Sequence, residues 1–165
     1  EKLPEIPVKY IGALSRLKKL EREKKYDFLI LLSGPEPQRT VLENNFLQIK
    51  NRFKEKILLI RGLPNEKEEL VFTNNFAVKN YCDAAELSEA IAQSEIVIAR
   101  SGYSTVMDLF CLQKKAIFIP TPGQTEQEYL AETLMDKGFA YAFRQDEKDY
   151  YGKILEGKEF DYKTL

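Results

Sequence analysis

Short apolar runs alternate along the chain with longer stretches in which hydrophobic residues recur at helical spacing. After the first run, Leu42, Phe46, Ile49 and Phe53 recur at the interval of an amphipathic helix. Repeated strand–helix–strand units predict an α/β fold: a doubly wound, mostly parallel sheet with helices on both faces. The apolar runs predict buried strands at residues 26–33, 56–61, 95–99 and 115–120, with weaker extended pieces at 70–73, 78–81 and 141–143.

Local signals mark several helix ends. Asp83 followed by Glu86 predicts a capping box, and Thr125 followed by Glu128 predicts a second one. Lys137-Gly138 predicts the end of that second helix, because a cation and a glycine are typical of a helix C-terminus.

Residues 1–165 are expected to form a single domain, since a chain of this length can bury roughly 70% of its unfolded surface. Residues 1–25 lack strand periodicity, and residues 145–165 are charged and rich in tyrosine. Both ends are therefore expected to be peripheral. The C-terminal tyrosines form a contact surface, pack on their own domain or pack on a missing partner domain. Residue 1 is Glu and not Met, so a natural subunit and an excised fragment both stay open.

Composition excludes several classes of function. The chain has 25 Lys and Arg against 26 Asp and Glu, a net charge of −1, which argues against a strongly basic nucleic-acid binder but leaves room for a local basic patch. Histidine is absent, which removes Ser-His triads and the commonest zinc ligand. Cys82 and Cys111 lie far apart, which favours a reducing compartment such as the cytoplasm. No apolar run approaches the roughly 20 residues that span a bilayer.

Two nucleotide-binding fingerprints are also missing. GxGxxG does not occur. Gly152, Gly157 and Lys158 nearly match a P-loop, but Glu159 stands where Ser or Thr is needed and no strand precedes the motif. No Asp-x-Asp pair occurs either, so we expect neither a metal site for a sugar diphosphate nor a cofactor.

The strongest chemical signal lies in residues 99–108. A strand ends there, a Ser101-Gly102 turn follows and a helix begins, so the free N–H groups of its first turn face the strand ends where ligands of parallel sheets bind. This arrangement suits a diphosphate, and Asp108 can accept hydrogen bonds from a ribose diol. On these residues alone, the alternative is equally good: Ser101 or Ser104 is only an N-cap, and Asp108 is an acid favoured by the helix dipole.

The next strand-to-helix loop, residues 120–129, is polar. Gln124, Gln127 and Glu128 can all hydrogen-bond hydroxyl groups. Glu128 also fits the capping box, and Gln127 also fits a solvated helix surface. Two adjacent loops, one presenting N–H groups and one carboxamides, would suit a nucleotide-sugar.

These motifs resemble a known family. Ala99-Arg-Ser-Gly-x-x-Thr-Val-x-Asp108, the strand 115–120 and Gln124-x-x-Gln-Glu-Tyr129 look like the C-terminal half of MurG-type glycosyltransferases. That half is the family 28 C-terminal domain of the GT-B fold, and the resemblance is best over residues 95–140. It implies a Rossmann-like domain that binds a UDP-sugar donor.

By position, the resemblance implies that Ser101, Gly102 and Thr105 contact the diphosphate and that Asp108, where MurG itself carries Glu, binds the ribose. The pair that reads the donor sugar falls on residues 127–128, where Glu128 departs from the family's second Gln. The candidate binding residues are Arg16, Gly34, Arg100, Ser101, Gly102, Ser104, Thr105, Asp108, Gln124, Gln127 and Glu128.

Two further segments correspond to family features. Residues 1–25 resemble the interdomain segment, with Arg16 at a position that faces the donor. Residues 33–39 stand where the family has a glycine-rich loop that includes Gly34. Pro35 and Pro37 remove N–H donors from this loop, which weakens it as a phosphate site.

The resemblance implies a hexosyltransferase: transfer of a hexosyl or N-acetylhexosaminyl group from a UDP-sugar, without a metal, with helix N–H groups stabilising the leaving diphosphate. The catalytic residues are unknown. They are expected in an N-terminal acceptor domain or a separate acceptor subunit, through which any contact with the inner face of the membrane is made. The isolated chain is expected to be inactive. Two other classes stay open: a UDP-sugar epimerase or hydrolase, and a non-catalytic nucleotide-binding or interaction domain.

Overall fold

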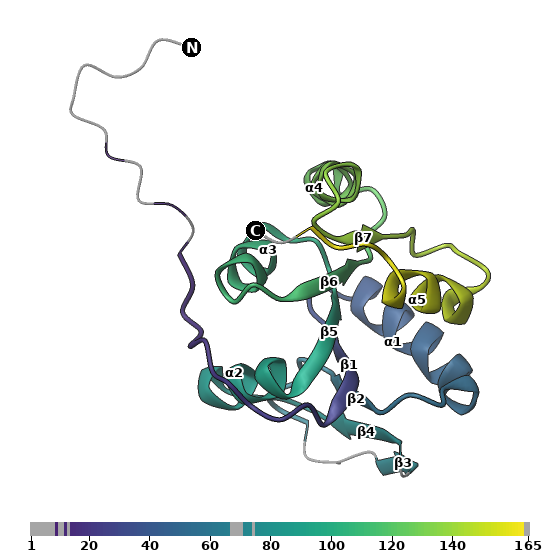
Figure 1. Ribbon diagram of the computed structural model, residues 1–165. Coiled ribbons are helices and arrows are strands. Elements are labelled where there is room, and N and C mark those ends of the chain that lie inside the picture. The colour runs from purple at the N-terminus through teal and green to yellow at the C-terminus, as the bar shows by residue number, and fades with distance from the viewer. Residues whose placement is uncertain (1–8, 10–11, 13, 67–70, 74, 164–165) are drawn as a thin grey trace.

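The computed structural model describes residues 9, 12, 14–66, 71–73 and 75–163 (Figure 1). The elements follow in the order β1 (Tyr26–Leu31), α1 (Gln38–Ile49), a 3-10 turn η1 (Lys50–Arg52), β2 (Ile57–Ile60), β3 (Val71–Thr73), β4 (Phe76–Lys79), α2 (Ala84–Gln93), β5 (Ser94–Ala99), α3 (Tyr103–Cys111), β6 (Lys115–Phe118), α4 (Thr125–Asp136), β7 (Tyr141–Ala142) and α5 (Tyr150–Lys158). The strands and helices predicted from the hydrophobic pattern are confirmed, with ends that differ by a few residues.

One sheet organises the domain. Its strand order is β3-β4-β2-β1-β5-β6-β7, and every neighbouring pair is parallel except β3–β4. The predicted doubly wound, mostly parallel sheet is therefore confirmed. From the central strand β1 the chain builds outward to β2 on one side and later to β5 on the other. The order thus reverses between β1 and β5, which is where ligands of such sheets bind.

Helices cover both faces of the sheet (Figure 1), and alternate residues of each strand point into different layers of the core. Phe28 and Ile30 of β1 pack with residues of α1 and α5 on one face. Leu29, between them, packs on the opposite face with residues of α2, α3 and α4. All three side chains are completely buried, which explains why β1 reads as a continuous apolar run.

The two predicted capping boxes have different outcomes. Asp83 accepts hydrogen bonds from the first turn of α2, and Glu86 reaches back to the Asp83 amide, so this box is confirmed. The Thr125–Glu128 box is wrong, because α4 begins one residue earlier than the pattern requires, with Gln124 at the N-cap and no side-chain cap. Glu128 instead accepts a hydrogen bond of 3.0 Å from the Gly123 amide.

The C-terminal segment lies deeper than the peripheral position expected for residues 145–165. Its helix α5 buries Tyr150 and Ile154 in the layer that also contains Phe46 of α1. The Tyr150 hydroxyl donates to the Gln145 carbonyl at 2.8 Å. The tyrosines of this segment thus pack on their own domain, which was one of the three interpretations left open.

The N-terminal segment is described only in part, since residues 1–8, 10–11 and 13 lie outside the described residues. From residue 14 the chain runs along α2 (Figure 1), where the Lys18 amide donates to Ser88 at 3.2 Å and Arg22 pairs with Glu89 at 2.6 Å. The assignment of residues 1–25 as an interdomain segment stays a prediction. No helix in the described ranges is both long and apolar enough to cross a membrane.

Candidate functional site

A pocket of about 200 Å³ opens at the point where the strand order reverses. We call it the switch-point pocket. Its polar lining comes from loops at the carboxyl ends of the parallel strands, from α3 and from the N-terminal segment. The residues used below are Arg16, Ser33, Gly62, Tyr81, Cys82, Ser104, Thr105 and Asp108.

Gly62 lets the chain leave β2 close to β1. Its φ is +71°, and a Cβ at this position would lie 2.7 Å from the Leu32 carbonyl oxygen. A larger residue would be strained both by the backbone conformation and by the contact. Glycine therefore keeps this wall of the pocket in place.

Arg100 holds the carboxyl edge of the sheet together from within. Only 2% of the residue is exposed. Its Nη1 donates to the carbonyls of Ile119 and Pro120, both at 3.0 Å, and its Nη2 donates to the Gln38 carbonyl at 2.9 Å and to the side chain of Gln145. Burial lowers the pKa of Arg100 to about 10, so the guanidinium stays charged at neutral pH. Arg100, a sequence candidate for binding, thus lies in the interior.

Ser101 connects the starts of two helices. Its side chain is completely buried, and its hydroxyl donates to the Gln127 carbonyl in the first turn of α4 at 2.8 Å. Because Ser101 itself stands just before α3, this bond fixes α3 and α4 relative to each other. The loops that lead into α3 and α4 are therefore held together as one structural unit.

The N-terminus of α3 is open. Gly102 is its N-cap residue and no side chain caps it, so neither Ser101 nor Ser104 is an N-cap and that alternative is wrong. No acid stands in the first turn either. Asp108 is therefore further along the helix than the dipole explanation requires. The first-turn N–H groups carry the positive end of the helix dipole.

Asp108 has a structural partner that the sequence did not indicate. Its Oδ1 accepts a hydrogen bond of 2.6 Å from the Ser15 hydroxyl, which ties the N-terminal segment to α3. Arg16, exposed beside it, lines the switch-point pocket together with Asp108. These two residues and Ser104 also line a second, shallower pocket of about 500 Å³, whose other residues are Gly12, Leu14, Tyr103 and Met107.

The polar loop before α4 is braced by its own side chains. Gln127 accepts a hydrogen bond from the Thr121 amide at 3.0 Å and donates to the Gln124 side chain. Gln127 and Gln124 are half-buried, which differs from the solvated helix surface considered for Gln127. The carboxamides that could meet a ligand are thus held in fixed positions.

The loop that carries Gly34 differs from the loop before α3, because a carboxylate lies beside it. Gly34 is exposed with a φ of +101°. Next to it, the Glu36 carboxylate accepts from the Thr40 amide in the first turn of α1 at 3.2 Å and pairs with Arg39 at 2.5 Å. Hydrogen bonds from Thr40 and Arg39 hold the pKa of Glu36 below its usual range. A carboxylate therefore already occupies the N-terminus of α1.

Behind this loop lies a buried charge network that sequence reasoning missed. Glu43, 4% exposed, binds Arg39 at 2.6 Å and Arg61 at 2.5 Å, and Arg61 continues to Asn80 at 3.0 Å. The i, i+4 spacing of Arg39 and Glu43 on α1 was the available signal. Arg61 follows β2, and no local pattern reveals that it lies beside Glu43.

Two further groups were considered for chemistry, namely clusters of metal-ligating side chains and the thiol of Cys82. In the described part of the chain, no three residues of the His, Cys, Asp and Glu types come together as a metal site. Burial raises the pKa of the Cys82 thiol, which keeps it protonated at neutral pH.

A mostly parallel sheet with helices on both faces and a pocket at the point where the strand order reverses defines a Rossmann-like α/β domain. Residues 36–157 match the glycosyltransferase family 28 C-terminal domain, and the chain belongs to this family. The resemblance noted from the sequence motifs is therefore confirmed.

Curated relatives carry one enzyme name, UDP-N-acetylglucosamine--N-acetylmuramyl-(pentapeptide) pyrophosphoryl-undecaprenol N-acetylglucosamine transferase. The one from Sulfurihydrogenibium sp. (strain YO3AOP1) is 28% identical over 145 residues, 82% of this chain and 40% of the relative. The one from Haemophilus influenzae (strain PittEE) is 30% identical over 129 residues, 76% of this chain and 36% of the relative. The chain thus spans well under half of these relatives.

Solved structures show the same fold. MurG from Acinetobacter baumannii aligns with a TM-score of 0.62 at 14% identity, covering 94% of this chain and 50% of that one. The solution structure of ALG13 aligns with a TM-score of 0.57 at 13% identity, covering 86% of this chain and 89% of that one.

Replacing Arg100 by Met should lower the free energy of unfolding by about 2–4 kcal/mol, because several buried carbonyl oxygens lose their donor together. Denaturant unfolding followed by circular dichroism measures this. Arg144→Met is the matched control, since the Arg144 guanidinium is exposed and pairs with the equally exposed Asp146. Equal stability of the two variants would contradict the role given to Arg100.

Proposed function

We propose that this domain binds the UDP-sugar donor of a glycosyltransferase and positions it for transfer of a hexosyl or N-acetylhexosaminyl group to an acceptor. The open N-terminus of α3 beside the switch-point pocket carries this proposal. The family and the enzyme name of the curated relatives support a UDP-N-acetylhexosamine as the donor class.

The diphosphate is assigned to the first turn of α3. Ser104 and Thr105 supply N–H groups there, with Gly102 giving close access to the backbone. The N-terminus of α1 is the poorer choice, because the Glu36 carboxylate would repel a phosphate. Helix N–H groups stabilise the leaving diphosphate as negative charge develops on it, in place of a bound cation.

The nucleoside is assigned to the switch-point pocket. Asp108 has a second carboxylate oxygen beyond the one that Ser15 occupies, and it can accept hydrogen bonds from a ribose diol. Arg16 stands beside it at the mouth of the pocket. The base then lies toward Gly62 and Tyr81, against the ends of β2 and β4.

The donor sugar is assigned to the braced loop before α4. Gln124, Gln127 and Glu128 carry the hydrogen-bonding groups, and Ser101 fixes this loop next to the diphosphate site. Both the oxygen and the nitrogen of the Gln127 side chain already form hydrogen bonds within the loop. Gln124 and Glu128 therefore have more hydrogen-bonding capacity left for sugar hydroxyls.

Acceptor binding and the general base are assigned to a second unit. The chain spans 40% of a relative that is named as a transferase. That unit is either an N-terminal domain of the same protein or a separate acceptor subunit.

Asp108→Asn should weaken UDP binding by about 1–3 kcal/mol, the usual loss for a charged hydrogen bond. Isothermal titration calorimetry of the folded domain measures it. Ser15→Ala is the control, because it removes the partner of Asp108 but keeps the carboxylate. It should leave UDP affinity unchanged. An equal loss in both variants would mean that Asp108 acts only by tethering the N-terminal segment.

UDP affinity of this domain should not depend on a divalent cation, since the α3 dipole already supplies about half a positive charge at the diphosphate. The same titration is repeated in EDTA and in magnesium chloride. A tenfold gain with magnesium, beyond its effect on free UDP, would contradict this assignment.

A further inference from the structure

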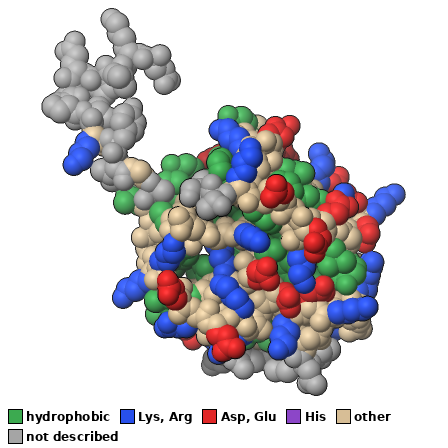
Figure 2. All heavy atoms as spheres, in the orientation of Figure 1, with side chains coloured by type: hydrophobic (Ala, Val, Ile, Leu, Met, Phe, Trp, Pro, Cys, Tyr) green, Lys and Arg blue, Asp and Glu red, His purple; other side chains and the backbone are tan. Residues whose placement is uncertain are grey.

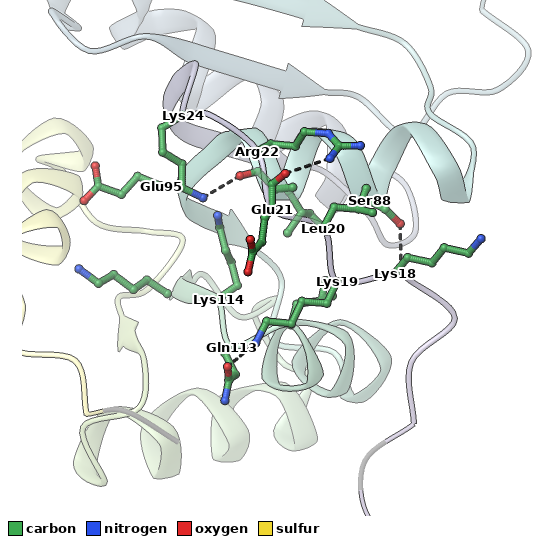
Figure 3. A pocket seen from close by; sticks show the side chains of 14 residues that line it. Lys18, Lys19, Leu20, Glu21, Arg22, Lys24, Ser88, Glu95, Gln113 and Lys114 are labelled. Atoms are coloured by element: carbon green, nitrogen blue, oxygen red, sulfur yellow. Dashed lines mark hydrogen bonds between the residues drawn. The ribbon is translucent and has the colours of Figure 1, made fainter.

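A hollow of about 430 Å³ lies at the amino edge of the sheet, the edge opposite the switch-point pocket (Figure 3). We call it the lysine hollow. The N-terminal segment, the C-terminal end of α2, the start of β5 and the turn before β6 enclose it. Its apolar lining is Leu20, Ile91, Ala92 and Leu112.

The charge of the lysine hollow departs from that of the chain as a whole. The net charge of the chain is −1, and basic and acidic side chains mix over the face seen in Figure 2. The hollow, by contrast, is lined by six cations and two acids: Lys18, Lys19, Arg22, Lys24, Lys114 and Lys115 against Glu21 and Glu95. Arg22 already pairs with Glu89.

Two of these cations meet inside the hollow. Lys24 and Lys114 reach it from different elements, and their amines lie next to each other (Figure 3). The Lys24 amine donates to the Ala92 carbonyl at 2.7 Å, and the Lys114 amine donates to the Ser94 carbonyl. These carbonyls fix both amines while leaving further N–H donors on each.

Among the residues that the structure describes, neither Lys24 nor Lys114 belongs to an ion pair. Burial, and then the neighbouring Lys24 amine, lowers the pKa of Lys114 to about 7. Glu95 on β5 acts in the opposite direction. Two like charges held side by side without a counter-ion are stabilised when an anion binds between them.

We propose that the lysine hollow is a second ligand site, which binds the phosphate or sulfate group of a small anionic molecule through Lys24 and Lys114. The site lies apart from the proposed donor site. The shape favours a soluble ligand over a lipid headgroup, because the two amines lie within a hollow with apolar walls. The remaining volume suits an organic group attached to the anion.

The test uses sodium sulfate as the probe and the ¹⁵N-labelled full chain, with ionic strength kept constant by sodium chloride. We expect saturable amide shifts at residues 18–24, 92–95 and 112–115. Lys114→Met and Lys24→Ala should each weaken binding about tenfold or more, as expected when one charged hydrogen bond is lost. Lys148→Ala, an exposed lysine outside the hollow, is the matched control and should bind as the unchanged protein does.

The pH dependence gives a second readout. Sulfate keeps its charge across neutral pH, so a change in affinity reports the protein. Affinity should fall as pH rises through 7, because Lys114, which faces Lys24, Lys115, Glu21 and Glu95 across the hollow, then loses its proton. Lys114→Met should remove this dependence.

Several results would overturn the proposal. They are the absence of shifts at the hollow, shifts that do not saturate, and equal losses in all three lysine variants. Co-sedimentation with phosphatidic-acid vesicles that Lys24→Ala and Lys114→Met both abolish would overturn the soluble source and assign the anion to a lipid. UDP is expected to bind at the opposite edge of the sheet. A failure of UDP to bind and a failure of sulfate to bind are therefore separate results.

Discussion

The carboxyl edge of the sheet depends on one buried guanidinium. Arg100 leaves the end of β5 and donates to carbonyls at the end of β6 and at the start of α1. A buried charge is costly unless it is hydrogen-bonded, and the two terminal nitrogens of Arg100 meet this need while its Nε stays without a partner, so these segments must hold their carbonyls in place around Nη1 and Nη2. Its neighbour Ser101 extends the same constraint to α4. Two consecutive residues thus fix the loops between which the proposed donor site lies.

The helices around this edge differ in how their first turns are satisfied. Asp83 caps α2, and Glu36 binds an amide of α1, but no side chain caps α3 or α4, and of these two it is α3 that begins beside the switch-point pocket. A side-chain cap typically stabilises a helix by about 1 kcal/mol. Leaving α3 without one costs stability and keeps its N–H groups available. A bound diphosphate would supply the missing acceptors, which links the local instability to the proposed function.

The fold could be predicted from the sequence because the patterns that indicate strands and helix ends are local. The apolar runs of β1 and β5 and the Asp83 box depend only on neighbouring residues, and the structure confirms them. Arg100 was a binding candidate because it stands in the motif at residues 99–108, yet its carbonyl partners lie far away in sequence. The Ser15–Asp108 bond and the Lys24–Lys114 pair also join distant segments, which no spacing rule brings together. The Thr125 box failed because a one-residue shift of a helix start changes which side chain reaches which amide.

The central claim is that the N-terminus of α3 and the switch-point pocket together hold a nucleoside diphosphate. NMR titration of the ¹⁵N-labelled chain with UDP tests this claim most directly. The account predicts saturable shifts at residues 101–108, at Gly62 and at residues 81–82, with smaller shifts at residues 124–128. Shifts confined to the amino edge of the sheet, or none at millimolar UDP, would contradict it.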